Sequence, residues 1–232
     1  MPIAVAHSTG TSSALFVPLP RRTIGDDVLD TLRKSIIAGA FASGDHIAEG
    51  TLAQQLGVSR APVREAMMQL EREGLLVFNK RGAALVKEFT TEDLDEIFSL
   101  RLTLETMAAR LACRELGEET SALIENNIER TRAARRLLDV TLLDVEFHDL
   151  IVRAAMHRRL YASWSNLRHQ IEVWLARMQS RLDAPVEKTR EATVLHHQGI
   201  LKALRSGKEE KAAKAVREHI EGWRRQFPKA KR

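Results

Sequence analysis

The chain of 232 residues contains little of what marks several classes of protein. A single cysteine, Cys113, excludes an intrachain disulfide framework and fits the reducing cytoplasm, and its helical surroundings predict a buried thiol with no catalytic role. Aromatic residues make up 5%, and the 12 glycines and 6 prolines are few, which favours helix. Apolar runs stay short of the roughly 18 residues that a membrane span needs, so no membrane contact is expected.

The charge balance is nearly even along the chain. The net charge is +5, but residues 1–88 carry 10 Lys/Arg against 9 Asp/Glu, and residues 89–232 carry 26 against 22. A small positive excess permits an anionic partner without requiring one. Any surface that binds nucleic acid must therefore come from the placement of its basic side chains.

Residues 21–88 are predicted to form a winged helix-turn-helix domain, preceded by a flexible tail of residues 1–20. Apolar side chains recur at helical spacing from Ile24, and that helix is expected to stop at Gly39. Two further helices follow, and the segment LLVFNKRGAALVKEF then alternates like two strands around a turn at 79–82. Three helices followed by a small β-hairpin are typical of this domain.

The third helix begins with residues that suit DNA. In LGVSRAPVREAMMQLEREGLL, a hydroxyl, two arginines and a proline gather at the helix start, while the rest of the helix has an apolar face. The second helix of such a motif enters the major groove N-terminus first. Arginine is the side chain that most often hydrogen-bonds the edge of a guanine base, and the N–H groups at a helix start can bind a phosphate. The alternative for these arginines is a solvated helix face. With a basic wing tip, the predicted DNA contacts are Ser59, Arg60, Ala61, Pro62, Arg64, Lys80, Arg81 and Gly82.

After the wing the apolar periodicity is helical, so residues 89–232 are predicted to form an all-α bundle. Asp144 and His148 lie four residues apart and project from one helical face, a spacing that suits two ligands of one metal ion. His197 and His219 each fall on the apolar stripe of their own helix, where an unpaired imidazole is costly. The alternative reading of each is a core histidine with an ordinary partner.

These segments resemble a known family. LAQQLGVSRAPVREAMMQLEREGLL with the following KRGA is similar to the winged-helix half of the GntR-type bacterial transcription regulators. The series DEIFSLRLTLETMAARLA, EFHDLIVRAA, HHQGILKALRSGK and AVREHI resembles the FCD effector-binding domain of their FadR-type branch. The resemblance implies a cytoplasmic repressor that binds a palindromic double-stranded DNA operator as a homodimer and is modulated by a small carboxylate metabolite. It does not imply an enzyme.

The resemblance also implies a metal site. In FCD-type regulators an Asp and three His at these motif positions hold a divalent ion, which assigns Asp144, His148, His197 and His219 as ligands. His196 adjoins the third position, but the family histidine lies three residues before the Ile-Leu-x-Ala-Leu run, which selects His197. Imidazoles with one carboxylate suit Zn²⁺, Ni²⁺ or another first-row ion, and an octahedral ion would keep positions open for a carboxylate.

Arg101 is the predicted effector contact. It shares a helical stripe with Ile97 and Leu104, so its guanidinium is expected to point into the bundle, where it needs an anion. FCD relatives have an arginine at this place, and the resemblance therefore favours a role for Arg101 in binding an effector carboxylate. The alternative is a pair within the helix with Glu105, four residues on.

One departure from the family and two rival functions stay open. Family members often carry a basic residue shortly before the LA of the second helix, whereas this chain has Glu49, Gly50 and Thr51, so a DNA contact from that position is expected to be missing. A metal-sensing regulator, in which the ion itself is the signal, is the alternative function. A catalytic metal is disfavoured because no further carboxylate stands at the spacing of a general base.

Overall fold

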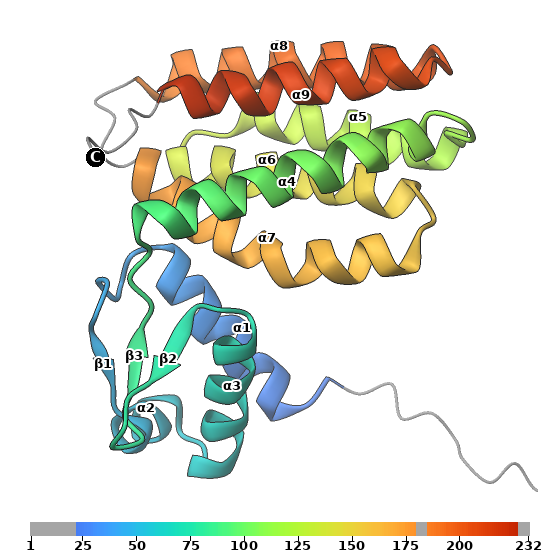
Figure 1. Ribbon diagram of the computed structural model, residues 1–232. Coiled ribbons are helices and arrows are strands. Elements are labelled where there is room, and N and C mark those ends of the chain that lie inside the picture. Colours follow the sequence, from blue (N-terminus) through green and yellow to red (C-terminus); the bar gives the residue numbers. More distant parts are fainter. Residues whose placement is uncertain (1–21, 180–184, 227–232) are drawn as a thin grey trace, which may run out of the picture.

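The computed structural model describes residues 22–179 and 185–226, so the predicted tail of residues 1–20 lies outside the described residues. The described chain is mainly α, as predicted, and forms a small N-terminal body beneath a larger helical bundle (Figure 1). The small body contains α1 (Ile24–Ile37), β1 (His46–Ile47), α2 (Glu49–Leu56), α3 (Arg60–Arg72), β2 (Leu76–Phe78) and β3 (Ala84–Val86). The bundle contains α4 (Thr91–Ala112), α5 (Glu118–Ala133), α6 (Leu137–Ala154), α7 (Arg158–Gln179), α8 (Val186–Arg205) and α9 (Glu209–Gln226).

Residues at the helix ends determine where the helices of the small body start and stop, and their apolar faces determine how they pack. Thr23 and Asp26 form a capping box that starts α1, because each side chain accepts a hydrogen bond from the other residue's backbone N–H. α2 ends at Gly57 and the turn after α3 lies at Gly74, with φ of 65° and 71°, a conformation that residues with a Cβ rarely adopt. The apolar faces of α1 and α3 meet in a core that includes Val28, Leu32, Ile36, Val63, Met67 and Leu70.

The sheet has one strand more than the sequence analysis predicts. β2 and β3 form the antiparallel hairpin of the wing, but β1 pairs with the other edge of β3, which gives the strand order β1-β3-β2. His46 lies opposite Leu85, and Ile47 lies opposite Ala84. A strand of two residues is too short to show an alternating pattern, and the segment FASGDHIAEG is rich in turn residues, so its pairing depends on β3 being in place.

The start of α2 also differs from the prediction. The hydroxyl of Thr51 before LAQQLG makes that residue a possible N-cap, whereas α2 begins at Glu49 with Ala48 at the N-cap and no side-chain cap. The earlier start places a carboxylate in the first turn, where the helix dipole stabilises negative charge. This position of Glu49 matters for the DNA-facing surface described below.

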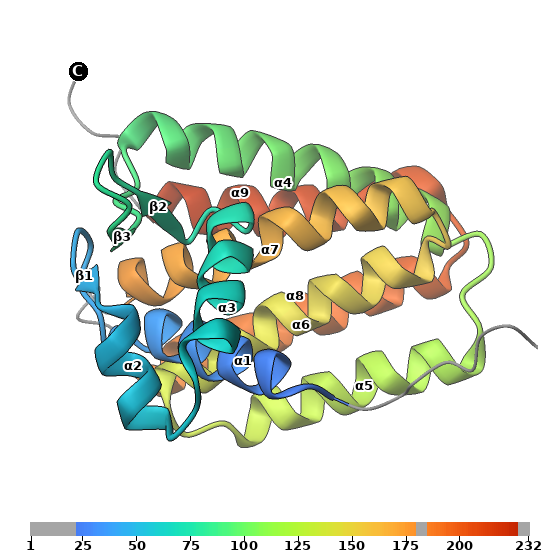
Figure 2. The same ribbon diagram turned by 90° about the horizontal axis from the view of Figure 1, so that it is seen from below.

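The bundle packs its helices around one large apolar core. Thr90 and Asp93 form a capping box at the start of α4. Trp164, Phe147 and Ile171 are fully buried, and Cys113 is a buried thiol whose pKa is raised by burial. Seen from below, α7 passes behind α3 with α6 beside it, and both helices face the small body (Figure 2), against whose core Leu142 of α6 and Val173 of α7 pack. Among the described residues, no helix is long and apolar enough to span a membrane.

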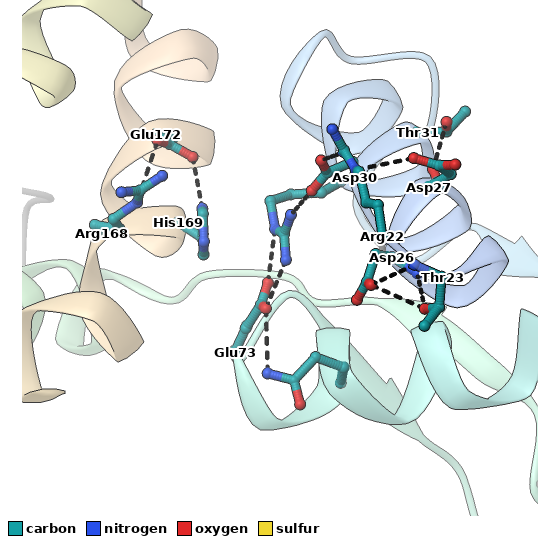
Figure 3. A network of polar contacts seen from close by, with 12 residues as sticks. Arg22, Thr23, Asp26, Asp27, Asp30, Thr31, Glu73, Arg168, His169 and Glu172 are labelled. Carbon is teal, nitrogen blue, oxygen red and sulfur yellow. Dashed lines mark hydrogen bonds and ion pairs between the residues drawn. The ribbon is translucent and has the colours of Figure 1, made fainter. Parts of the chain in front are cut away.

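α7 also closes the junction between the two bodies. Its Val173 is buried in the core of the small body, and a Cβ added to Gly74 would come within 2.7 Å of the Gln170 side chain. Figure 3 shows His169 of α7 on the side of that helix that faces Glu73, the residue that ends α3. The end of α3 is therefore packed directly against the bundle.

Candidate functional site

The predicted DNA contacts gather at the start of α3. Ser59 occupies the N-cap position with extended backbone, φ −70° and ψ 166°, but its side chain makes no capping hydrogen bond. The first turn also has no acidic residue, in contrast to α1 and α4. The first N–H groups of α3 therefore have no side-chain acceptor from the cap and can donate to an outside anion. Arg60 and Ala61 are exposed, and Pro62 is half-buried.

Two arginines of α3 converge on the first turn of α2. Arg64 donates from Nε to Glu49 Oε2 at 2.9 Å and from Nη2 to Oε1 at 3.3 Å. The guanidinium of Arg60 lies beside Gly50, since an ideal Cβ built there would be 3.3 Å from its Nη2. A surface hollow connects Arg64 and Glu49 with Gly82 of the wing. The start of α3 and the wing tip thus share one face of the molecule.

The wing tip is a tight turn that exposes its basic residues. Asn79 Oδ1 accepts from the backbone N–H of Arg81 at 2.9 Å and of Ala83 at 3.0 Å, and Gly82 has φ 76°. Lys80, Arg81 and Gly82 are all exposed. The turn thereby presents two cations beside the start of α3, as a wing that contacts a DNA backbone would require.

A second cluster lies deep in the bundle. Asp144 and His148 come from successive turns of α6, His197 from α8 and His219 from α9, and none is more than 3% exposed. Asp144 Oδ1 lies 3.2 Å from His197 Nε2, 3.4 Å from His219 Nε2 and 4.0 Å from His148 Nε2. One ligand atom of each residue lies within 4.8 Å of all the others. Folding therefore brings together the four residues that the sequence analysis selects.

The chemistry of this cluster fits a divalent cation. Among the described residues, Nε2 of His148 and of His219 has no hydrogen-bond partner although it is buried, which is costly unless a bound group uses the lone pair. Burial lowers the pKa of His197 to about 3 and that of His219 to about 4, so both are neutral near pH 7, as metal ligands must be. Burial opposes ionisation of Asp144, but His197 and His219 hold the pKa of its carboxyl well below its usual value.

Arg101 points into the bundle and borders the cluster. Its Nε donates to Glu105 Oε1 at 2.8 Å, and its Nη2 lies 3.5 Å from Asp144 Oδ2. The intrahelical pair with Glu105 that the sequence left as an alternative is present. It does not remove the guanidinium from the cluster, because a side chain with five N–H donors can serve more than one acceptor.

Glu105 is a member of the site that the sequence analysis considered only as a partner of Arg101. Its Oε2 contacts Nδ1 of His148. Burial opposes the charge on Glu105, but His148 and Arg101 lower the pKa of its carboxyl. A carboxylate on Nδ1 holds the histidine tautomer that leaves Nε2 free for a metal. The only indication of this role in the sequence is that Glu105 lies four residues after Arg101, on the same face of the helix.

The structure also separates the two adjacent histidines of α8. His197 is fully buried, and its ring stacks on Phe147 with a centroid distance of 3.6 Å. His196 is exposed, and its ring lies 5.5 Å from that of His219 without entering the cluster. The choice of His197 over its neighbour therefore agrees with where the side chains lie.

A winged helix-turn-helix with arginines at the start of its second motif helix, joined to an all-helical domain, defines a DNA-binding transcriptional regulator. Residues 24–86 match the family model described as bacterial regulatory proteins, gntR family, and residues 96–222 match the FCD domain. The chain belongs to the GntR family of transcriptional regulators and carries an FCD domain.

Known relatives agree with this assignment. The chain is 37% identical to the uncharacterised HTH-type transcriptional regulator YdhC of Bacillus subtilis, over 56% of this chain and 59% of that protein. It is 28% identical to the gluconate operon transcriptional repressor of Bacillus licheniformis, over 88% of this chain and 84% of that one. It is 31% identical to the probable D-xylose utilization operon transcriptional repressor of Paenarthrobacter nicotinovorans, over 87% of this chain and 88% of that one.

The fold is shared with solved regulators. Escherichia coli McbR/YncC superposes with a TM-score of 0.74 at 22% identity, over 90% of this chain and 100% of that chain. The relatives are transcriptional regulators rather than enzymes, as the sequence predicts, and two of those named above are called repressors.

Proposed function

We propose that this regulator is a repressor that binds a palindromic operator as a homodimer and is modulated by a small carboxylate bound beside a divalent metal in the FCD domain. The observation that carries the proposal is the buried convergence of Asp144 Oδ1 with three histidine Nε2 atoms, bordered by the guanidinium of Arg101. Three imidazoles and one carboxylate suit a first-row ion such as Zn²⁺ or Ni²⁺.

The DNA-facing half supports operator binding. The uncapped start of α3, with Ser59, Ala61 and Pro62 along it, suits a phosphate, and Arg60 and Arg64 suit base edges or phosphates. Lys80 and Arg81 on the wing suit the backbone or an adjacent minor groove. A dimer would place two such surfaces on two half-sites, which accounts for a palindromic operator.

The positive charge of a bound metal ion and of Arg101 favours an effector that carries a negative charge. A metal ion with four protein ligands in octahedral geometry keeps positions that a carboxylate can fill, and Arg101 supplies a cation beside them. One relative is named as the repressor of a gluconate operon, and gluconate is a hydroxy carboxylate; another is named as a probable repressor of a D-xylose utilization operon, and D-xylose is an uncharged sugar. The buried guanidinium favours the carboxylate.

The burial of the cluster favours one alternative. Each ligand residue is at most 3% exposed, so a bare ion fits the described conformation more readily than an ion with a metabolite on it. In that case the metal itself would be the signal, and operator affinity would respond to the ion at a fixed concentration of metabolite.

The first experiment is a measurement of metal content by mass spectrometry on the purified chain, with Asp144→Ala and, as a matched control on the same helix, Asp139→Ala. Asp139 is a half-exposed acid paired with Arg136, remote from the cluster in its contacts. About one first-row ion per chain, kept in the control and lost in Asp144→Ala, supports the proposal. No ion in a folded wild-type protein, purified without chelator, refutes the metal-dependent part.

DNA binding is tested separately, because it depends on other residues. Selection from a pool of random duplexes should enrich a motif with two-fold symmetry, and sedimentation should give a dimer on that duplex. Simple carboxylates, including gluconate, are then added to the metal-loaded complex. Release or retention by a carboxylate supports the effector, a response to metal alone supports the sensor, and a motif without symmetry refutes the homodimer on a palindrome.

A further inference from the structure

Glu49 is the first of residues 49–51, a stretch in which members of the family often carry a basic residue. Because α2 begins at Glu49, its carboxylate lies in the first turn, where the helix dipole favours negative charge. From there it accepts from Arg64 at 2.9 and 3.3 Å across the gap between the two motif helices. The acidic residue of that stretch is thus joined to an arginine at a predicted DNA-contact position.

The geometry of the Glu49–Arg64 pair leaves one edge of the Arg64 guanidinium available for a hydrogen bond to a DNA base. Glu49 binds the side edge of the guanidinium, which is formed by Nε and Nη2. The end edge, formed by Nη1 and Nη2, still carries parallel N–H groups of the kind that suit O6 and N7 of guanine. The Arg64 side chain is 69% exposed and that of Glu49 is 23% exposed, so the arginine is displayed while its partner is partly enclosed.

Two consequences follow for DNA binding. A long side chain that is already held in place loses less conformational freedom when it binds, which favours the one base that matches its direction. A carboxylate beside the arginine also reduces the local positive charge, and with it the counterion release that drives binding to any sequence. The pair therefore increases selectivity at the cost of general affinity.

We propose that Glu49 is a specificity-determining residue: it positions Arg64 for recognition of one base pair in each half-site and weakens its attraction to DNA of any sequence. The inference rests on the proposed operator binding. Gly50 completes the arrangement, because its lack of a side chain leaves room for the Arg60 guanidinium on the same turn of α2.

The test uses the full chain and a pool of duplexes with a randomised core. Wild type, Glu49→Gln, Arg64→Ala and the double variant are each used for selection. Glu65→Gln is the matched control, because Glu65 is an exposed acid on α3 and its replacement removes the same charge. Exposed ion pairs add little to stability, so Glu49→Gln is expected to fold, which circular dichroism checks.

The expected result has two opposite parts. Glu49→Gln loses about tenfold preference at the base pairs where Arg64→Ala also loses it, and the double variant loses no more than Arg64→Ala alone. At the same time Glu49→Gln binds a scrambled duplex more tightly and with a steeper dependence on salt. Glu65→Gln changes only the binding of the scrambled duplex.

Three results would overturn the role of Glu49. They are a full motif selected by Glu49→Gln, an equal loss of preference in Glu65→Gln, or additive losses in the double variant. In each of them the wild type still selects a motif, so operator binding stands and only the positioning role is removed. A wild type that enriches no motif at all refutes operator binding itself, and the inference with it.

Discussion

Two neighbouring histidines of α8 provide the sharpest test of the metal site. His197 is fully buried, lies 3.2 Å from Asp144 Oδ1 through its Nε2, and is assigned as a ligand. His196 is exposed and lies outside the cluster. His197→Gln and His196→Gln therefore make the same chemical change one residue apart, and only the first should alter metal binding.

The size of the effect follows from mass action. Metal at about 100 times its Kd stabilises the folded chain by about 2.7 kcal/mol, which corresponds to a rise in Tm of about 5–11 °C for a chain of this length. Loss of one of four ligands should weaken affinity by about 100-fold or more. At the same metal concentration this leaves only about 0.4 kcal/mol, a shift of about 1–2 °C.

The assay is thermal unfolding of chelator-treated protein with and without Zn²⁺ or Ni²⁺. Each variant is compared with its own metal-free state, because His197→Gln also loses the ring that stacks on Phe147 and lowers the starting Tm. His196→Gln should keep the full rise and His197→Gln should lose most of it. The ligand assignment is refuted if His197→Gln keeps the rise, or if His196→Gln loses as much of it.

Three further predictions concern the DNA-binding domain. Glu73 accepts from Arg33 at 2.9 and 2.7 Å; burial opposes its charge, but Arg33 lowers the pKa of the Glu73 carboxyl below 4.5. Glu73→Gln should therefore cost about 2–3 kcal/mol in urea unfolding at pH 7, and the gap to wild type should close as the pH falls below 4.5; a gap independent of pH contradicts this. Gly74→Ala should cost about 1–2 kcal/mol by the same assay, because φ is 71° and the new Cβ would meet Gln170; an unchanged midpoint would refute the strain. Lys80→Ala should weaken binding to all duplexes alike and reduce the salt slope by about 1, and a change in the selected motif would instead make it a base reader.

The sequence indicated which side chains of the Asp/His cluster point into the bundle, because that signal lies within single helices. Asp144 and His148 share a face by their four-residue spacing, and His197 and His219 fall on apolar stripes, so each side chain had to point inward. That three helices bring these atoms within 4.8 Å of one another came only from the family resemblance, since periodicity fixes a direction and not a distance.

What escaped prediction depends on contacts between elements. β1 has two residues and exists only because β3 offers an unpaired edge. Glu105 reaches His148 because α4 and α6 pack in one register, and Glu49 reaches Arg64 because α2 starts three residues earlier than an N-cap at Thr51 would place it. A side chain's partner on another helix is set by packing, which a single sequence does not display.

The packing of α7 also determines how the two halves of the molecule can influence one another. α7 contributes Trp164 and Ile171 to the core of the bundle and Val173 to the core of the small body. Trp164 Nε1 donates to Asp149 at 3.0 Å, and Asp149 follows His148 directly on α6. The link after β3 and helix α6 also join the two cores, because Phe89 packs against both of them and Leu138 and Leu142 of α6 pack against the core of the small body. Such close packing shifts as a unit rather than deforming gradually. A rearrangement of α6 on binding a ligand would therefore reach the small body directly through Leu138 and Leu142, and would also reach the end of α3 through α7.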